Sequence, residues 1–163
     1  MIRKIAIVGN PNVGKSVLFN NLTGSYAIVS NYPGTTVEVS RGKANISGFD
    51  FEIIDTPGMY SLLPITEEER VTRKILFNEK PCLVIHVIDT KNLERMLSLT
   101  LQLKEAGFPL IIDLNIMDEA LSNGIEINIL ALEKELGVPI VETVSTLKEG
   151  MDILKTKIME ICR

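Results

Sequence analysis

The sequence predicts a single α/β domain with a six-stranded, mostly parallel sheet, one antiparallel strand, and helices on both faces. Apolar runs alternate along the chain with segments of helical periodicity, as expected when helices connect parallel strands. A short glycine-containing connection, Ser47-Gly-Phe-Asp50, joins two strand-like runs as a hairpin, which makes one strand antiparallel. The chain has 163 residues, 45% of them hydrophobic, and is therefore long enough to bury a proper core.

The expected strands are apolar or alternating runs that end at polar or turn-forming residues. The first run leads directly into a glycine, and the second and third flank the hairpin connection. Val, Ile and Leu dominate the later runs, which is typical of strands buried on both faces. The expected strands span Lys4–Val8, Val37–Ile46, Phe49–Asp55, Leu83–Asp89, Leu110–Asn115 and Ile140–Val144.

The expected helices carry apolar residues at helical spacing between these strands. They span Lys15–Thr23, Glu67–Phe77, Leu93–Ala106, Asn128–Leu136 and Gly150–Ile161. The segment Gly24–Thr36 is expected to form a loop, and its length suggests a function. In open sheets of this kind ligands bind beyond the carboxyl ends of the strands, so we expect the chemistry just after Val8, Asp55, Asn115 and Val144.

Composition excludes several classes of function. The net charge of −4 and the absence of a basic run argue against binding nucleic acid through its phosphates. Cys82 and Cys162 lack metal-ligand spacing, so we interpret them as reduced structural thiols. His86 lies in an apolar run and is expected in the core rather than as a metal ligand. The apolar stretches are too short to span a bilayer, and the chain itself is expected to be soluble.

A phosphate-binding pattern stands between the first strand and the first helix. The run Gly9-Asn-Pro-Asn-Val-Gly-Lys-Ser16 matches G-x-x-x-x-G-K-[ST], in which backbone N–H groups and the helix N-terminus face an anion. Lys15 is expected to add a point charge at the β and γ phosphates, and Ser16 to offer its hydroxyl to Mg²⁺. The expected phosphate contacts are Gly9, Asn10, Pro11, Asn12, Val13, Gly14, Lys15, Ser16 and Val17.

Two further segments are expected to complete the magnesium and γ-phosphate site. Asp55-Thr-Pro-Gly58 follows a strand, so Asp55 would hold Mg²⁺ through water and Gly58 would offer an N–H to the γ-phosphate. Thr35 and Thr36 are candidates for the hydroxyl that completes the Mg²⁺ shell, and we choose Thr36 because it directly precedes the next strand. Alternatively, both threonines merely start that strand.

A guanine-reading pattern follows the fifth strand. In Asn115-Ile-Met-Asp118 the Asp118 carboxylate would accept hydrogen bonds from N1–H and the exocyclic amino group of guanine, a donor pair that adenine lacks. Alternatively, Asp118 only caps a helix. We also expect contacts from Asn115 and Met117. The base pocket would be completed by backbone N–H groups of Ser145, Thr146 and Leu147, unless that segment is a loop without ligand contact.

Together these motifs indicate a Ras-like P-loop GTPase fold, and their details narrow the family. The segments Gly9–Ser16, Asn31–Glu38, Asp55–Ser61, Asn92–Arg95 and Asn115–Ala120 resemble the cytosolic G domain of FeoB, the prokaryotic ferrous iron transporter. The resemblance covers essentially the whole chain. Tyr32, Thr35 and Thr56 stand where the family usually has Trp, Val and Leu, which affects the contacts of the first switch loop most.

The resemblance implies a function and missing parts. It implies a GTP-binding and GTP-hydrolysing regulatory domain, on the cytoplasmic side of an inner membrane protein, that switches conformation with nucleotide state in ferrous iron uptake. FeoB proteins continue into a helical domain and a membrane domain, which would be this domain's partners, and self-association is possible as well. The segments Ser25–Thr36 and Gly58–Glu69 would be the switches that order around γ-phosphate and Mg²⁺.

The catalytic expectations follow from Met59 and Asn12. Met59 stands where related enzymes often carry the Gln that orients the attacking water, so slow intrinsic turnover is expected. The resemblance implies activation by K⁺ held by Asn12, although Asn12 could also serve only to shape the loop. The expected catalytic residues are Asn12, Lys15, Thr36 and Gly58. Ile116 replaces the usual Lys of the guanine motif, so weaker binding and fast GDP release should follow.

Three alternatives remain open from the sequence. The main one is a GTPase module of a ribosome-assembly or RNA-modifying protein, against which stand the acidic balance and Ile116. The second is an interaction switch without hydrolysis, which Met59 permits. The third is an ATP-binding P-loop domain, which requires the match of Asp118 to be a coincidence.

Overall fold

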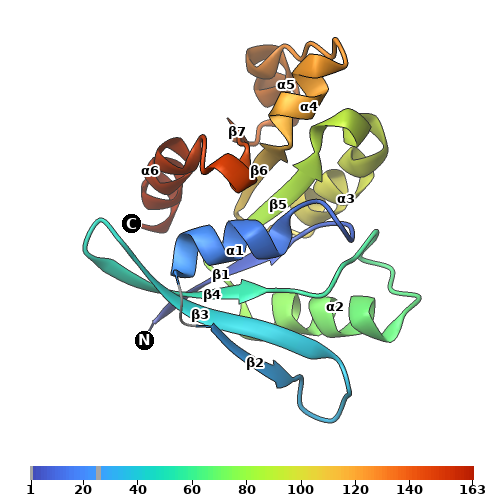
Figure 1. Ribbon diagram of the computed structural model, residues 1–163. Coiled ribbons are helices and arrows are strands. Elements are labelled where there is room, and N and C mark those ends of the chain that lie inside the picture. The colour runs from blue at the N-terminus through green and yellow to red at the C-terminus, as the bar shows by residue number, and fades with distance from the viewer. Residues whose placement is uncertain (1, 25–26) are drawn as a thin grey trace.

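Seven strands form one mixed sheet in the order β2-β3-β4-β1-β5-β6-β7 (Figure 1). The computed structural model describes residues 2–24 and 27–163. β3 runs antiparallel to both of its neighbours, β2 and β4, and all the other pairs are parallel. The strands are β1 Arg3–Val8, β2 Ala27–Asn31, β3 Glu38–Ile46, β4 Phe49–Asp55, β5 Leu83–Asp89, β6 Leu110–Asn115 and β7 Ile140–Glu142.

The predicted α/β P-loop fold is confirmed, but the prediction of six strands was wrong. The missed strand, β2, lies inside the segment Gly24–Thr36 that the sequence suggested was a loop. Its five residues are all exposed at the edge of the sheet, so it lacks the apolar periodicity on which the prediction relied. β7 ends at Glu142 rather than Val144, because the Val144 N–H turns away to bond the carbonyl oxygen of Glu149.

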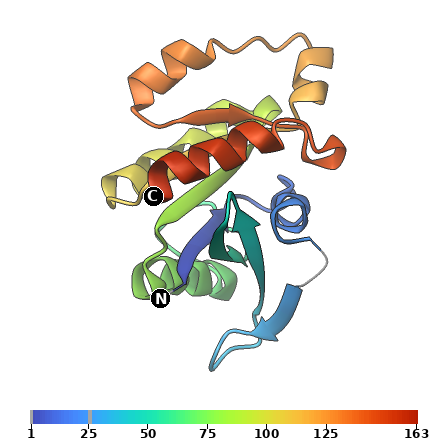
Figure 2. The same cartoon turned by 90° about the vertical axis from the view of Figure 1, so that its left-hand side faces the viewer.

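Helices cover both faces of the sheet (Figures 1 and 2). α1 and α6 lie on one face, where Asn21 of α1 donates to the carbonyl oxygen of Ser145 just before α6. α2 and α3 lie on the other face. The α-helices are α1 Lys15–Thr23, α2 Glu67–Glu79, α3 Leu93–Glu105, α4 Met117–Ser122, α5 Ile129–Leu136 and α6 Met151–Cys162. Two short 3-10 turns, η1 Thr90–Asn92 and η2 Ser145–Leu147, precede α3 and α6.

The five predicted helices are all present, with bounds within two residues of those expected, while the sequence indicates α4 only through the alternative in which Asp118 caps a helix. Its six residues are too few to show helical periodicity. α2 begins with a capping box, in which the Thr66 hydroxyl accepts from the Glu69 N–H and the Glu69 carboxylate accepts from the Thr66 N–H. At α5 the Asn128 side chain accepts from the Ala131 N–H, which places Asn128 outside the helix as its cap.

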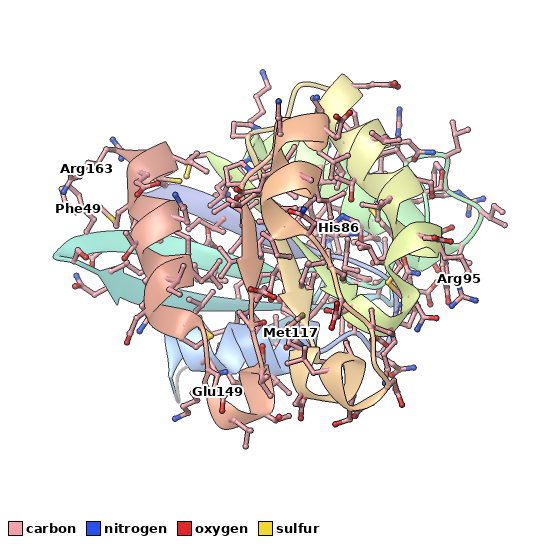
Figure 3. The ribbon with its side chains drawn as sticks, turned by 90° about the horizontal axis from the view of Figure 1, so that it is seen from above. Phe49, His86, Arg95, Met117, Glu149 and Arg163 are labelled. Atoms are coloured by element: carbon pink, nitrogen blue, oxygen red, sulfur yellow. The ribbon has the colours of Figure 1, made fainter. Side chains whose placement is uncertain are left out.

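The core is built around the central strands. All residues of β6 and six of the seven residues of β5 are buried, in agreement with the apolar runs. His86 on β5 is fully buried, as predicted, and its Nδ1 lies 2.8 Å from the Thr100 hydroxyl of α3 (Figure 3). Burial, with a smaller contribution from Lys15, lowers the pKa of His86 to about 3. The imidazole is therefore a neutral core group at physiological pH.

The thiols of Cys82 and Cys162 lie 2.9 Å apart, within hydrogen-bonding distance, and form no disulfide. Cys82 directly precedes β5 and Cys162 ends α6, so this contact joins the helix to the sheet. Within the part of the chain that the structure describes, no helix is long and apolar enough to cross a membrane.

Candidate nucleotide-binding site

The phosphate loop connects β1 to α1 and is packed too closely for side chains at its two glycines. A Cβ on Gly9 would lie 2.5 Å from the carbonyl oxygen of Val87, and a Cβ on Gly14 would lie 2.2 Å from the side-chain nitrogen of Asn115. Gly14 also has a φ of 98°, which L-residues rarely adopt. The two glycines therefore let the loop pass against β5 and β6 with its backbone free to face an anion.

Lys15 is almost buried at the start of α1. Its ammonium donates to the carbonyl oxygen of Asn10 at 2.8 Å, so the side chain lies back over the loop. Burial lowers the pKa of Lys15, and the carboxylate of Asp55 acts in the opposite direction. The ammonium of Lys15 thus lies over the loop, and its role at phosphate oxygens stays a prediction.

Ser16 and Asp55 come together from α1 and the end of β4. The Ser16 hydroxyl donates to a carboxylate oxygen of Asp55 at 2.7 Å. Burial raises the pKa of Asp55, while the Ser16 hydrogen bond and the Lys15 charge lower it. A cavity of about 290 Å³ opens beside the pair. A hydroxyl and a carboxylate are hard oxygen ligands that suit Mg²⁺, so the residues present fit that ion.

The two threonines of the first switch lie elsewhere in this structure. Residues 32–37 connect β2 to β3, and Ser25, where the predicted switch begins, lies outside the described residues. The Thr35 hydroxyl donates to the carbonyl oxygen of Tyr32 at 2.9 Å and accepts from the Val37 N–H at 3.2 Å, which closes a local turn. Thr36 is exposed. The cavity beside Ser16 is lined from this region by Val29, Glu38 and Ser40 instead.

The second switch begins against the phosphate loop. A Cβ on Gly58 would lie 2.7 Å from the Pro11 ring, so only glycine allows this approach. The Met59 N–H donates to the carbonyl oxygen of Gly9 at 3.0 Å, and the Met59 side chain is fully buried. Met59 therefore points into the core and cannot contact a water beside the phosphates.

A buried carboxylate holds the rest of this switch. Glu69 of α2 accepts hydrogen bonds from the N–H groups of Tyr60, Ile65 and Thr66, at 3.0, 2.8 and 3.2 Å. Burial disfavours the charged form of Glu69, but the three donors outweigh burial and lower the pKa of the carboxyl. The loop between Gly58 and α2 is thereby fastened at both of its ends to one side chain.

The guanine motif lies where β6 and β7 end. The Asn115 amide donates to the carbonyl oxygen of Val13 at 3.0 Å and accepts from the Ser145 N–H at 3.0 Å, so it ties the phosphate loop to η2. The Leu147 N–H is already bonded to Val144. Of the three N–H groups expected to contact guanine, those of Ser145 and Leu147 are thus used within the protein, which leaves that of Thr146.

Asp118 and Met117 open α4 in different surroundings. The Asp118 side chain is exposed at the first turn, whereas Met117 is buried and packs in the core. Ile116, which precedes them, has a φ of 60°, a left-handed conformation that a β-branched residue rarely adopts. Asn12 has a φ of 63°, a left-handed conformation that asparagine tolerates, and its side chain is exposed.

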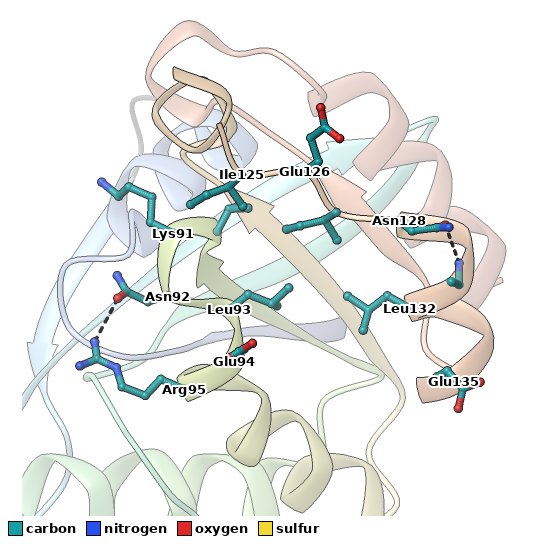
Figure 4. Close-up of a pocket in the computed structure, with 13 residues that line it drawn as sticks. Lys91, Asn92, Leu93, Glu94, Arg95, Ile125, Glu126, Asn128, Leu132 and Glu135 are labelled. Carbon is teal, nitrogen blue, oxygen red and sulfur yellow. Dashed lines mark hydrogen bonds between the residues drawn. The ribbon is translucent and has the colours of Figure 1, made fainter. Parts of the chain in front are cut away.

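A cavity of about 780 Å³ lies beside this site rather than in it (Figure 4). It opens between η1 with the start of α3 and the segment that leads into α5. Apolar side chains such as Leu93 and Leu132 line it together with charged ones such as Glu94 and Glu135. The phosphate loop contributes none of its lining residues.

Sequence reasoning missed the residues that support the site from behind. The Thr90 hydroxyl donates to the carbonyl oxygen of Asn115 at 2.7 Å, and Thr143 donates to the Asn115 side-chain oxygen at 3.1 Å. No motif marks either threonine. Glu69 could have been found, because Thr66 and Glu69 have the spacing of a capping box.

Comparison with known proteins agrees with this geometry. A family model described as ferrous iron transport protein B matches residues 3–158. A fusion of Fe(2+) transport protein A with the Fe(2+) transporter FeoB from Porphyromonas gingivalis is 44% identical over 159 residues, 97% of this chain and 19% of that protein. The chain thus spans about a fifth of the length of such curated relatives.

Solved structures extend the likeness to three dimensions. The G domain of the T. maritima FeoB iron transporter aligns with a TM-score of 0.92 and 39% identity, covering 100% of both chains. The cytosolic domain of the same transporter in a GMPPNP form aligns with a TM-score of 0.95 and 40% identity, covering 100% of this chain and 64% of that one. The match of the family model over nearly the whole chain shows that it belongs to the FeoB family of ferrous iron transport proteins, as their N-terminal G domain.

Proposed function

We propose that this domain binds guanine nucleotide with Mg²⁺, hydrolyses GTP, and regulates a ferrous iron transporter from the cytoplasmic side of the inner membrane. The observation that carries the proposal is the 2.7 Å contact between Ser16 and Asp55 beside the buried ammonium of Lys15. These groups are the expected partners of a nucleotide's phosphates and their metal ion. The helical and transmembrane domains of the longer relatives would be the partners that sense its state.

The residues present assign roles at the phosphate end. The backbone of Gly9–Ser16 would face the phosphates and Lys15 would neutralise their charge. Mg²⁺, held by Ser16, Thr36 and, through water, Asp55, would offset the negative charge that the β and γ phosphates share. Thr36 would reach this position only after the connection between β2 and β3 rearranges, so we assign switching to that segment.

Hydrolysis would not depend on a side chain at position 59. Because Met59 is buried and its N–H is bonded to Gly9, the attacking water would be oriented by backbone groups such as the Gly58 N–H. The exposed side chain of Asn12 is available to hold K⁺ beside the phosphates, where a cation would stabilise developing charge. We therefore propose slow hydrolysis that K⁺ stimulates.

Selectivity for guanine would reside in Asp118. Its exposed carboxylate at the start of α4 is able to accept two hydrogen bonds from guanine, and adenine cannot supply that pair of donors. The Thr146 N–H would face the guanine oxygen. A T. maritima relative is described in a GMPPNP form, which agrees with binding of a guanine triphosphate at such a site.

The test is GTP turnover by the purified domain in matched KCl and NaCl buffers, for the wild type and Asn12→Ala, with ATP as competitor. Faster turnover in KCl that the variant loses, with ATP ignored, would support the proposal. Turnover that is the same in both salts would contradict the role of K⁺. Inhibition by ATP would contradict the assignment of Asp118.

A further inference from the structure

Three side-chain oxygens form a buried chain behind the guanine motif. A carboxylate oxygen of Asp113 on β6 lies 2.5 Å from the Thr143 hydroxyl, which lies 3.1 Å from the side-chain oxygen of Asn115. Asp113, Thr143 and Asn115 are 0, 1 and 3% exposed. Thr143 is itself held in place, because its N–H bonds Leu114 and its carbonyl oxygen accepts from Met117.

The orientation of the Asn115 amide is fixed by other partners. Its nitrogen donates to the carbonyl oxygen of Val13, and its oxygen accepts from the Ser145 N–H. Turning the amide over would place two donors, or two acceptors, against each other at both contacts. The atom that faces Thr143 is therefore an oxygen without a hydrogen.

The number of hydrogens then determines the state of Asp113. Two contacts between three oxygens need two hydrogens, and the Thr143 hydroxyl supplies only one. Asn115 supplies none at this atom, so the second must sit on Asp113. The other oxygen of Asp113 has no hydrogen-bond partner among the described residues, which a neutral acid tolerates far better than a buried carboxylate.

We propose that Asp113 is a positioning residue: as a neutral carboxylic acid it donates to Thr143, so that the Thr143 hydroxyl donates to Asn115 and holds it for guanine nucleotide. Ionised Asp113 would take the only available hydrogen, and the Asn115 oxygen would lose a donor. Because Asn115 joins the phosphate loop to η2, its displacement would loosen both. The inference rests on the proposed binding of guanine nucleotide.

The surroundings of Asp113 contain little charge that could hold it ionised. It pairs in register with Val87 of β5 and Val141 of β7, while the ionisable His86 and Glu142 stand one position away and point to the opposite face. On its own face, α1 contributes one ionisable group, Lys15, whose ammonium bonds Asn10. α6 contributes Cys162, which contacts Cys82, and four exposed or half-buried groups: Asp152, Lys155, Lys157 and Glu160.

The affinity for nucleotide should therefore depend on pH. Burial raises the pKa of Asp113 to about 7, and the Thr143 hydrogen bond opposes this effect. Nucleotide would bind best to the protein with Asp113 protonated, so affinity falls as the pH rises through this value. Loss of one hydrogen bond to Asn115 should weaken binding about tenfold, roughly 1.4 kcal/mol.

The test is the affinity for a fluorescent GDP analogue at about pH 6 and about pH 8.5, on either side of the Asp113 pKa. Asp113→Asn carries a permanent hydrogen-bond donor in place of the acid. Its affinity should therefore match that of the wild type at the lower pH and be about tenfold higher than that of the wild type at the higher pH. Thr143→Val should bind about tenfold more weakly than the wild type at low pH. Glu142→Gln, an exposed carboxylate on the adjacent strand, is the control and should follow the wild type.

Infrared spectroscopy gives a second readout without nucleotide. A protonated carboxyl band present at low pH in the wild type, and missing from Asp113→Asn, would support the proposal. Its absence, or an Asp113→Asn variant with the pH dependence of the wild type, would overturn it. If the wild type bound no GDP at either pH, the proposed function would fail, and the infrared band would still decide the protonation of Asp113.

Discussion

The ion pairs of Glu79, at the end of α2, allow the effect of a substitution on the free energy of unfolding to be predicted in size. Its carboxylate accepts from both terminal nitrogens of Arg41, at 2.6 and 2.9 Å, and from the Lys4 ammonium at 2.6 Å. These contacts fasten α2 to β3 and β1. The Arg41 hydrogen bonds, with those of Lys4 and against the effect of burial, lower the pKa of Glu79 from its ordinary 4.5 to about 2.

The change we consider is Glu79→Gln, which removes the charge and keeps the shape. A difference of that size between folded and unfolded pKa corresponds to about 3 kcal/mol, at 1.36 kcal/mol per unit. The partners are a quarter to a third exposed, at 26 and 33%, so screening by solvent reduces the expected loss to about 2 kcal/mol. Glu52→Gln is the matched control. Its oxygens lie 3.5 and 3.6 Å from the same cations, and it should cost less than about 0.5 kcal/mol.

The assay is urea unfolding of the wild type and both variants, at neutral pH and in acid. The folded-state pKa of Glu79 is depressed, so its contribution is complete above the unfolded pKa and is lost as the pH falls through the folded one. The difference between the wild type and Glu79→Gln should shrink to roughly two fifths of its neutral value at about pH 3. A loss no larger than that of Glu52→Gln, or one that does not shrink in acid, would refute the reasoning.

Three further predictions concern the nucleotide site. Asp118→Asn should weaken GDP binding by roughly ten- to a hundredfold and improve binding of xanthosine diphosphate, because the ring carbonyl of xanthine accepts a hydrogen bond from an amide. Competition titrations measure both affinities, and an unchanged preference for GDP would exclude Asp118 from the base pocket. Glu69→Gln should cost about 1–2 kcal/mol and speed amide hydrogen exchange between Tyr60 and Thr66, because their N–H groups lose a charged acceptor; exchange at the wild-type rate would contradict this. Ile116→Asn should raise the free energy of unfolding by about 1 kcal/mol, because Asn tolerates the left-handed backbone that strains isoleucine. A thermal scan measures the change, and a lower Tm would show that isoleucine packing outweighs the strain.

The sequence by itself determined the fold class and predicted the phosphate site. Both depend on local patterns: the apolar runs that became β5 and β6, and the strand–loop–helix context of Gly9–Ser16. Such patterns are readable because a strand or a phosphate loop places its requirements on neighbouring residues. The edge strand β2 escaped because exposed residues carry no periodic signal, and α4 because it is short.

Only the tertiary structure decided which side chains share an environment. It brought Asp113, Thr143 and Asn115 into one hydrogen-bonded chain, although β7 lies far from β6 in sequence. It also turned Met59 into the core and placed Glu69 over the second switch. Contacts between residues distant in sequence depend on strand register and on packing of the whole chain, and a single sequence contains no local pattern from which they could be predicted.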